Sequence, residues 1–346
     1  MQIGSNKYPT TDYIRYQVRC IVRYMKAIRI GQTGGPEVMR YEEVPEPVPG
    51  PSEVLVEIEI AGVNFIDTYH RQGLYPLGLP FTPGIEAAGR VVRLGSEVEG
   101  IGEGERVVFC LSLGTYAEMA LVEAWKLIRL PQGVDPEVGV TAMCQGMTAH
   151  YLITDSFELK SGDTALVHAA AGGVGLLLVQ MAKRAGATVL GTVSTEEKRR
   201  VALEAGADQV VLYGEEDFEE TVHKYTDNVG VDVVYESVGK NTFEKSLNCL
   251  KPRGYMVLFG QASGPVPPLD PQVLSQKGSL FLTRPTLGDY VANRVELEKR
   301  ATDVLGWIQS GDLKVTIGRT FPLAQAELAH RALEGRETSG KVLLTP

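Results

Sequence analysis

The segment from Thr164 to Ser194, TALVHAAAGGVGLLLVQMAKRAGATVLGTVS, constrains the fold more than any other part of the chain. A short apolar run from Thr164 to Val167 leads into a turn of alanines and glycines, and a helix-period pattern follows from Leu176 to Ala185. This order predicts a strand, a tight turn and a helix. Such a turn suits a dinucleotide, because small side chains let a pyrophosphate approach the backbone N–H groups at the start of the helix.

The turn carries the candidate pyrophosphate-binding residues. Against the G-x-G-x-x-G pattern, Ala170, Gly172 and Gly175 occupy the three glycine positions, so an alanine replaces the first glycine. Gly173 and Val174 lie between them at the start of the predicted helix. The motif is weak alone, but a second apolar run ends about 20 residues after the turn, where the next parallel strand of such a fold should end.

The end of this second run, Thr188 to Val193, predicts which cofactor binds. NAD-binding folds usually carry an acidic residue there, which would repel a 2′-phosphate. This chain instead has Ser194, then Lys198 and, after the following apolar run, Tyr213. Hydroxyl groups and an ammonium suit a phosphate, so we expect NADPH. Two neighbouring glutamates weaken the attraction, and the alternative for Lys198 is an exposed helix lysine.

Composition limits the class of protein. A chain of 346 residues exceeds the usual size of a single core, so we expect about two domains. The net charge of -9 argues against nucleic acid or an anionic membrane as the main partner, and no apolar run is long enough to span a bilayer. The cysteines are too far apart for a CxxC pair, which favours a reducing, cytoplasmic location over a disulfide framework or a zinc knuckle. They are Cys20, Cys110, Cys144 and Cys249.

The N-terminal part divides into an extension and a β domain. Residues 1–24 are polar and basic, and we expect a non-core extension, either a cloning remnant or an upstream start, rather than a targeting presequence. Residues 25–124 predict short strands separated by glycine-rich turns and no helices. The clearest strand is the alternating run Val54 to Ile60, and the others are expected at 25–30, 88–92 and 106–109.

Polar groups follow the alternating strand in the segment Ala61 to Pro76, AGVNFIDTYHRQGLYP, which we expect to be a loop. Asn64, Asp67 and Tyr69 are its candidate active-site residues, because loops at strand ends commonly carry such groups. The alternative is a surface turn in which Asn64 and Asp67 cap the backbone.

After Ser194, helical and strand patterns alternate, which predicts an α/β fold with a doubly wound parallel sheet of six strands. Helices are expected at 196–205, 218–225 and 242–250, and strands at 209–213, 231–235, 255–259 and 279–283. Ligands bind at the carboxyl ends of such strands, which selects Ser237, Phe259, Gly260 and Arg284. From Thr286 we expect a long helix to Ser310, an amphipathic segment at 323–333 and a closing strand at 341–344, returning to the first domain.

Several motifs together resemble one family. NFIDTYHRQGLYP, HAAAGGVG, FGQASGP with LTRPT, and AHRALEGRETS followed by GKVLL are similar to the zinc-independent quinone oxidoreductases of the medium-chain dehydrogenase/reductase superfamily, over residues 25–346. The resemblance implies a GroES-like β domain at 25–144, completed by 286–346, and a Rossmann domain at 145–285. It also implies NADPH as cofactor, a small quinone as substrate, and a homodimer formed through the edges of the Rossmann sheets.

The resemblance further implies roles for individual residues. The nicotinamide would lie near Asn64, Asp67 and Tyr69, with Gln145 and Thr148 bordering the same cleft. Some relatives have a lysine where this chain has Gln145, which puts a cationic role there in doubt. The remaining implied contacts are Gly172, Gly173 and Val174 for the pyrophosphate, Ser194, Lys198 and Tyr213 for the 2′-phosphate, Phe259 for the ribose, and Arg284 and Arg336 as cationic contacts.

Zinc-dependent relatives place a cysteine near Asn64 and a histidine within the segment Pro83 to Gly89, and they carry a four-cysteine lobe. None of these is present here, so no zinc site is expected. His330, on an apolar helical face, is expected to be a packing residue.

Without a metal, the substrate must accept hydride readily, as a quinone does. We expect Tyr69 to donate a hydrogen bond to the developing oxyanion and Asn64 to orient the nicotinamide or substrate. Two alternatives stay open: reduction of an activated C=C bond in an enone or enoyl thioester, and a non-catalytic NADPH-binding protein of the crystallin or RNA-binding type.

Overall fold

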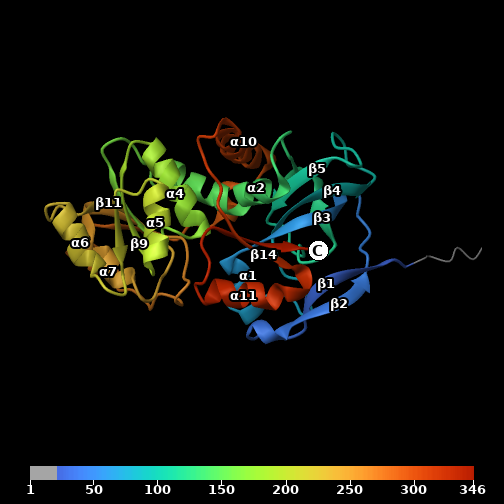
Figure 1. Ribbon diagram of the computed structural model, residues 1–346, viewed down its shortest axis with the longest axis horizontal. Coiled ribbons are helices and arrows are strands. Elements are labelled where there is room, and N and C mark those ends of the chain that lie inside the picture. Colours follow the sequence, from blue (N-terminus) through green and yellow to red (C-terminus); the bar gives the residue numbers. More distant parts are fainter. Residues whose placement is uncertain (1–21) are drawn as a thin grey trace, which may run out of the picture.

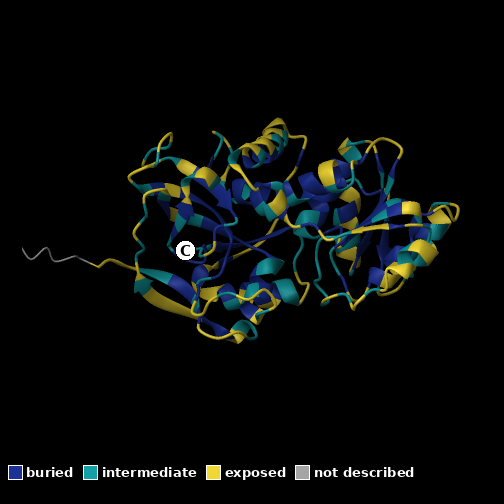
Figure 2. Ribbon diagram, turned by 180° about the vertical axis from the view of Figure 1, so that it is seen from behind, coloured by how far each residue is buried: buried dark blue, intermediate teal, exposed yellow. Residues whose placement is uncertain are grey.

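The computed structural model describes residues 22–346, so the predicted extension lies outside the described residues except for its last three. Two β-sheets lie side by side along the long axis of the molecule (Figure 1). One is a parallel sheet flanked by helices, and the other is a largely antiparallel sheet that holds the C-terminal strand. The buried residues gather within these layers, while exposed residues lie on the outer faces of the helices (Figure 2).

The parallel sheet confirms the predicted doubly wound fold. Its strands lie in the order β10-β9-β8-β11-β12-β13, and every neighbouring pair is parallel. The chain therefore builds outward from β8 in one direction and then in the other, which leaves a crevice beside the carboxyl end of β8. The strands are β8 (Thr164–His168), β9 (Thr188–Val193), β10 (Gln209–Leu212), β11 (Val231–Glu236), β12 (Leu250–Leu258) and β13 (Phe281–Thr283).

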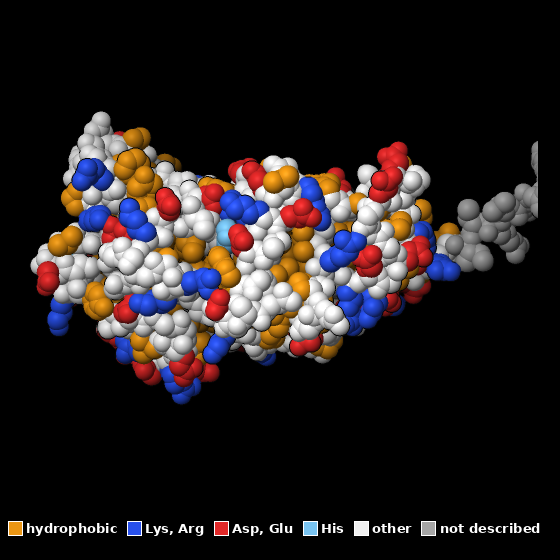
Figure 3. Space-filling model, turned by 90° about the horizontal axis from the view of Figure 1, so that it is seen from above, with side chains coloured by type: hydrophobic (Ala, Val, Ile, Leu, Met, Phe, Trp, Pro, Cys, Tyr) orange, Lys and Arg blue, Asp and Glu red, His pale blue; other side chains and the backbone are white. Residues whose placement is uncertain are grey.

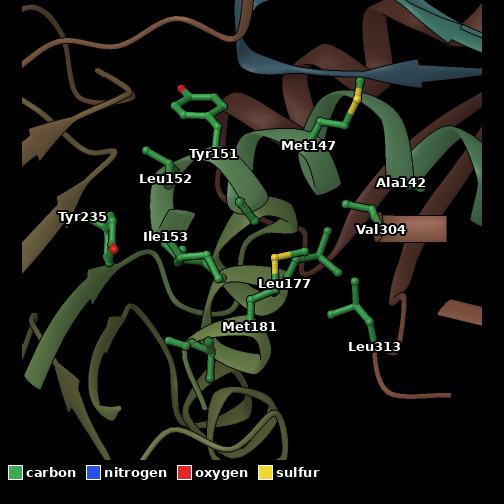
Figure 4. Close-up of a cluster of buried hydrophobic side chains, with 14 of the residues drawn as sticks. Ala142, Met147, Tyr151, Leu152, Ile153, Leu177, Met181, Tyr235, Val304 and Leu313 are labelled. Atoms are coloured by element: carbon green, nitrogen blue, oxygen red, sulfur yellow. The ribbon is translucent and has the colours of Figure 1, made fainter. Parts of the chain in front are cut away.

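Helices cover both faces of this sheet (Figure 1). They are α4 (Gly173–Arg184), α5 (Glu196–Glu204), α6 (Phe218–Tyr225), α7 (Phe243–Asn248) and α8 (Gln272–Gln276). The largest core cluster joins this layer to the helical segment at residues 136–156, which precedes β8 in the chain. Figure 4 shows Tyr151 and Leu152 of that segment in the same buried cluster as Leu177 and Met181 of α4 and Val304.

The second sheet has seven strands, and a separate hairpin packs beside it. Its central strand β3 is buried on both faces over much of its length, so Val54, Leu55 and Val56 are all buried, whereas strict alternation was predicted. The reason is that β3 pairs with β4, β6 and β15 and lies inside the domain. The strands are β1 (Tyr24–Ile30), β2 (Met39–Pro45), β3 (Glu53–Val63), β4 (Glu86–Leu94), β5 (Arg106–Cys110), β6 (Met119–Glu123), β7 (Ile128–Arg129), β14 (Ile317–Pro322) and β15 (Lys341–Thr345), and the short 3-10 turns are η1 (Pro36–Val38), η2 (Ala124–Lys126) and η5 (Leu323–Gln325).

The predicted loop after β3 is wrong, because the segment forms helix α1 (Phe65–Gln72). Asn64 is its N-cap, and Asp67 completes a capping box by accepting a hydrogen bond from the Asn64 N–H. Gly73 ends the helix in the left-handed region at φ 78, a conformation that glycine adopts without strain. Capping at both ends stabilises a short helix in a segment whose surroundings are rich in glycine.

One further helical prediction needs correction. The expected helix from Thr286 to Ser310 is interrupted, forming α9 (Leu287–Tyr290) and α10 (Arg294–Ser310), because Asn293 caps a new helix by accepting from the Glu296 N–H. Residues 136–156 form one continuous helical run, so the boundary expected at 144/145 falls inside it. This run consists of α2 (Pro136–Thr141), the π turn η3 (Ala142–Gly146), α3 (Met147–Tyr151) and the π turn η4 (Leu152–Ser156).

The C-terminal segment crosses back to the antiparallel sheet. Helix α11 (Ala326–Glu334) lies beside α1 and packs against β14 and β15 (Figure 1). Strand β15 then pairs antiparallel with the last residues of β3, with Val342 opposite Val63. This pairing brings Lys341, the first residue of β15, directly beside Asn64.

Candidate active site

A single cleft runs between the two sheets and brings together residues from widely separated parts of the chain. One wall consists of α1, η3 and the C-terminal segment, and the other consists of the turns at the carboxyl ends of β8, β9, β10, β11 and β12. Most of the predicted site residues line it. They are Asn64, Tyr69, Gln145, Thr148, Gly172, Gly173, Val174, Gly175, Ser194, Lys198, Tyr213, Ser237, Phe259, Gly260, Arg284 and Arg336.

The turn after β8 presents the start of α4 to the cleft. Gly172 is the N-cap, and no side chain caps the helix, so its first N–H groups face the cleft without a side-chain partner. Gly175 allows α4 to approach the preceding turn, because a Cβ there would overlap the carbonyl oxygen of Ala169. An uncapped helix N-terminus with close backbone approach is suited to bind a phosphate.

Ala170, predicted to contact the cofactor, is not among the residues that line the cleft. It is fully buried, and its methyl group lies near Gly191 of β9. The strained residue of the turn is instead Ala169, at φ 51 in the left-handed region. The G-x-G-x-x-G alignment thus identified the turn, but the alanines that line the cleft are Ala169 and Ala171.

Lys198 and Arg336 form a cationic end of the cleft. The Lys198 Nζ donates to the Arg336 carbonyl oxygen at 2.6 Å, and the Arg336 guanidinium donates to the Tyr213 hydroxyl at 3.0 Å. Partial burial, together with the nearby Arg336 charge, lowers the pKa of Lys198. Two cations held close together repel each other, so this end of the cleft favours a ligand with a dianionic group.

Tyr69 projects from α1 into the opposite end of the cleft. Its hydroxyl oxygen accepts a hydrogen bond from the Gln261 N–H at 3.3 Å, and the ring of Tyr75 packs edge-on against its ring at 5.5 Å. Burial raises the pKa of Tyr69 to about 12. The phenol therefore stays protonated at neutral pH, and its proton is available to a ligand oxygen because the Gln261 contact uses only a lone pair.

Asp67, a predicted catalytic group, lies behind Asn64 and Tyr69 and is not among the residues that line the cleft. Its Oδ2 accepts from the Asn64 N–H at 2.9 Å and from the Tyr116 hydroxyl at 2.9 Å, and the residue is fully buried. Burial raises the pKa of Asp67 from 3.8 to about 7, against the lowering effect of these two hydrogen bonds. The carboxyl group belongs to the framework of α1.

A directed hydrogen-bond chain extends from Asp67 to α11. Arg71 can only donate, so its contact with His330 Nδ1 at 2.9 Å makes that nitrogen an acceptor and leaves the ring proton on Nε2. His330 Nε2 then donates to the Tyr116 oxygen at 3.2 Å, and Tyr116 donates to Asp67. Burial lowers the pKa of His330 to about 3, in agreement with a neutral ring. His330 is buried on α11, but it connects polar groups as well as packing.

Asn64 is held by two charged residues that the sequence analysis missed. Its Nδ2 donates to Glu86 Oε1 at 2.7 Å, and its Oδ1 accepts from the Lys341 ammonium at 3.0 Å. Lys341 and Glu86 form an ion pair, and both side chains are fully buried. Their signal in the sequence was a single charge beside the apolar residues of KVLL and IEAAG, which is unusual for buried strands unless the charge is paired.

Metal-ligating side chains are dispersed over residues 22–346. Among these residues, no three His, Cys, Asp or Glu side chains come together in a way that could hold a metal ion. Helices in this part of the chain are also too short or too polar to cross a bilayer. On the face shown in Figure 3, basic side chains are interspersed with acidic ones along the length of the molecule.

Comparison with known proteins identifies the class and then the family. Residues 50–132 match the alcohol dehydrogenase GroES-like domain, and residues 173–299 match the zinc-binding dehydrogenase domain, which together define a medium-chain dehydrogenase or reductase. The quinone oxidoreductase of Pseudomonas aeruginosa is 45% identical over 93% of this chain and 99% of its own length. This chain belongs to the quinone oxidoreductase family of the medium-chain dehydrogenase/reductase superfamily.

Two further relatives describe the range of this family. The structure of Escherichia coli quinone oxidoreductase complexed with NADPH has a TM-score of 0.91 and 43% identity, covering 93% of this chain and 100% of that one. A 2-haloacrylate reductase from Burkholderia is 43% identical over 92% of this chain and 98% of its own length.

Replacing Asp67 by Asn should change how stability depends on pH. The pKa of Asp67 is raised in the folded state, so the protonated form stabilises the fold, and this contribution is present below about pH 4 and lost as the pH rises through about 7. Between these limits, the free energy of unfolding should shift in favour of Asp67→Asn over the wild type by on the order of 3 kcal/mol. Urea unfolding at several pH values measures this. The exposed substitution Glu99→Gln is the control, and parallel curves for Asp67→Asn and the wild type would contradict the assignment.

Proposed function

We propose that this protein is an NADPH-dependent quinone reductase. The observation that carries the proposal is one continuous cleft with an uncapped helix N-terminus and a cationic end on one side, and a buried amide and a protonated tyrosine on the other. The family relationship supports the same activity. When bound, NADPH supplies the hydride that reduces the acceptor.

The residues of the cleft fit this cofactor. We propose that the N–H groups at Gly172 to Gly175 bind the diphosphate, because they start helix α4 at the cleft and no side chain caps them. Lys198 and Arg336, with Tyr213 and Ser194, would bind the 2′-phosphate. Arg284 lines the same cleft, and its guanidinium donates to Tyr75 at 3.3 Å.

At the reacting end, Tyr69 is our candidate hydrogen-bond donor. A quinone oxygen gains negative charge as the ring accepts hydride, and a fixed phenol stabilises that charge without losing its own proton. Asn64 is held by the buried ion pair of Lys341 and Glu86, and it would orient the nicotinamide or the substrate. Thr148, Ser237, Phe259 and Gly260 would complete the walls around this position.

Reduction of a conjugated C=C bond is a second candidate. The 2-haloacrylate reductase among the relatives is named for such a substrate. Hydride transfer to an activated alkene also builds charge on a carbonyl oxygen, so the same donor would serve. The cleft includes apolar side chains that suit either substrate, among them Phe65, Ile66, Leu111 and Leu287.

Steady-state oxidation of NADPH and NADH with 1,4-benzoquinone, 9,10-phenanthrenequinone and a short enone tests both candidates. We expect quinone turnover that prefers NADPH and is insensitive to chelator, whereas turnover with the enone alone would move the function to C=C reduction.

Lys198→Ala should weaken NADPH binding about tenfold or more and leave NADH unchanged, because a charge-assisted hydrogen bond contributes about 1.5–3 kcal/mol. The exposed helix lysine substitution Lys224→Ala is the control. Equal losses for both cofactors would contradict the role of Lys198.

Tyr69→Phe tests the donor. Loss of the hydroxyl should lower kcat for quinone by about a hundredfold to a thousandfold, since one preorganised donor to a developing oxyanion has an effect of about this size. NADPH binding, measured by its fluorescence, should change little because the phosphate contacts are intact. Unchanged turnover would remove Tyr69 from the mechanism.

We also propose a homodimer formed through β13. This strand is the edge of the parallel sheet, and it exposes Phe281 (50%) and Leu282 (37%), with Phe281 stacked on Tyr255 at 4.5 Å. An apolar edge strand is a template for pairing with a second copy. Sedimentation should show a dimer that Leu282→Lys converts to a monomer, and a monomeric wild type would contradict the proposed dimer.

We further propose a cytoplasmic location, which recovery in the membrane fraction would contradict.

A further inference from the structure

The buried pair of Lys341 and Glu86 makes more contacts than the ion pair alone. Lys341 also donates to the Val63 carbonyl at 3.4 Å and to Asn64 Oδ1 at 3.0 Å. Glu86 Oε1 accepts from Asn64 Nδ2, and its Oε2 accepts from the Cys144 N–H of η3 at 2.8 Å. Two buried charges are costly to desolvate, so the arrangement persists only because these additional bonds satisfy both groups.

These contacts fix the direction of two side-chain amides. An ammonium only donates and a carboxylate only accepts, so Asn64 must place its oxygen toward Lys341 and its nitrogen toward Glu86. Gln145 has one amide atom 3.5 Å from that oxygen, and this atom must therefore be the donor Nε2. The charges of Lys341 and Glu86 therefore decide which atom of the Gln145 amide is the oxygen and which is the nitrogen, although the two atoms are similar in shape.

The remaining amide atom, Gln145 Oε1, is buried and has no hydrogen-bond partner among the described residues. Gln145 lines the cleft and is more than nine-tenths buried. Its amide lies against Gly173, where a Cβ would overlap it. A buried acceptor without a partner destabilises the site, and a ligand with a suitably placed donor would satisfy it.

We propose that Lys341 and Glu86 are positioning residues, which orient Asn64 and through it Gln145 so that Gln145 Oε1 accepts a hydrogen bond from an N–H or O–H donor bound in the cleft. The donor has two possible sources, the primary amide of the nicotinamide or a hydroxyl group of the reduced product. The inference rests on the proposed function for these two sources. Neither Lys341 nor Glu86 lines the cleft, so both act through the amides.

Dissociation constants for NADP⁺ and its 3-acetylpyridine analogue identify the donor, because the analogue has no amide N–H. The wild type should bind NADP⁺ about fivefold to tenfold more tightly than the analogue, and Gln145→Met should bind both equally. If the wild type shows no such preference, Gln145→Met should instead weaken product inhibition by 1,4-hydroquinone by a similar factor, which assigns the donor to the hydroxyl. If Gln145→Met changes neither measurement, the proposal is overturned.

The double variant Lys341→Met with Glu86→Gln tests the positioning role. It removes both charges together, so no unpaired charge is left buried. It should lose the same discrimination as Gln145→Met, while binding of adenosine 2′,5′-bisphosphate stays within about twofold of the wild type. The exposed pair Lys26→Met with Glu43→Gln is the control, since Lys26 and Glu43 form a surface ion pair at 3.3 Å.

Discrimination retained in the folded double variant would overturn the positioning role. If the double variant does not fold, Asn64→Ala is measured instead, since it removes the oxygen that holds Gln145 Nε2 and leaves the two buried charges paired. Discrimination retained in that single variant would equally overturn the positioning role. Failure of the proposed function would look different, because the wild type would then bind adenosine 2′,5′-bisphosphate weakly or show no quinone turnover.

Discussion

The cleft depends on the buried ion pair between Lys341 and Glu86. These residues lie on β15 and β4, and their contacts reach Asn64 at the end of β3 and the Cys144 N–H in η3. Neither charge could be buried alone, because removing an ion from water costs several kcal/mol unless a partner is present. Four segments from opposite ends of the chain must therefore meet before this end of the cleft has its structure.

The strand that carries Lys341 also connects the antiparallel sheet to the glycine turn after β8. Gly340 donates to the Ala171 carbonyl at 3.1 Å and forms a bridge with Gly172, while Val342 pairs with Val63. The three consecutive residues Gly340, Lys341 and Val342 therefore extend from the start of α4 to the neighbourhood of Asn64. Backbone hydrogen bonds therefore connect the start of α4 to the strand that pairs beside Asn64.

The sequence predicted what depends on local pattern. The βα alternation and the glycine turn specify the doubly wound sheet, because periodicity and small residues act over short stretches. Helix α1 was missed because glycine density was given more weight than the capping box of Asn64 and Asp67, which was a readable local signal. The contact between Tyr116 and His330 joins residues 214 positions apart, so only the assembled fold could reveal it.

Helix α1 shows how the framework and the site are separated on one element. Asp67 and Arg71 are four residues apart and so share a face, which is bound to Tyr116 and His330, whereas Tyr69 between them points the opposite way, toward the cleft. The titrating carboxyl group is therefore on the face away from the ligand, where its charge affects stability. The cleft face carries a phenol whose pKa is too high for it to ionise near neutral pH, so it offers a donor that does not change with moderate changes in pH.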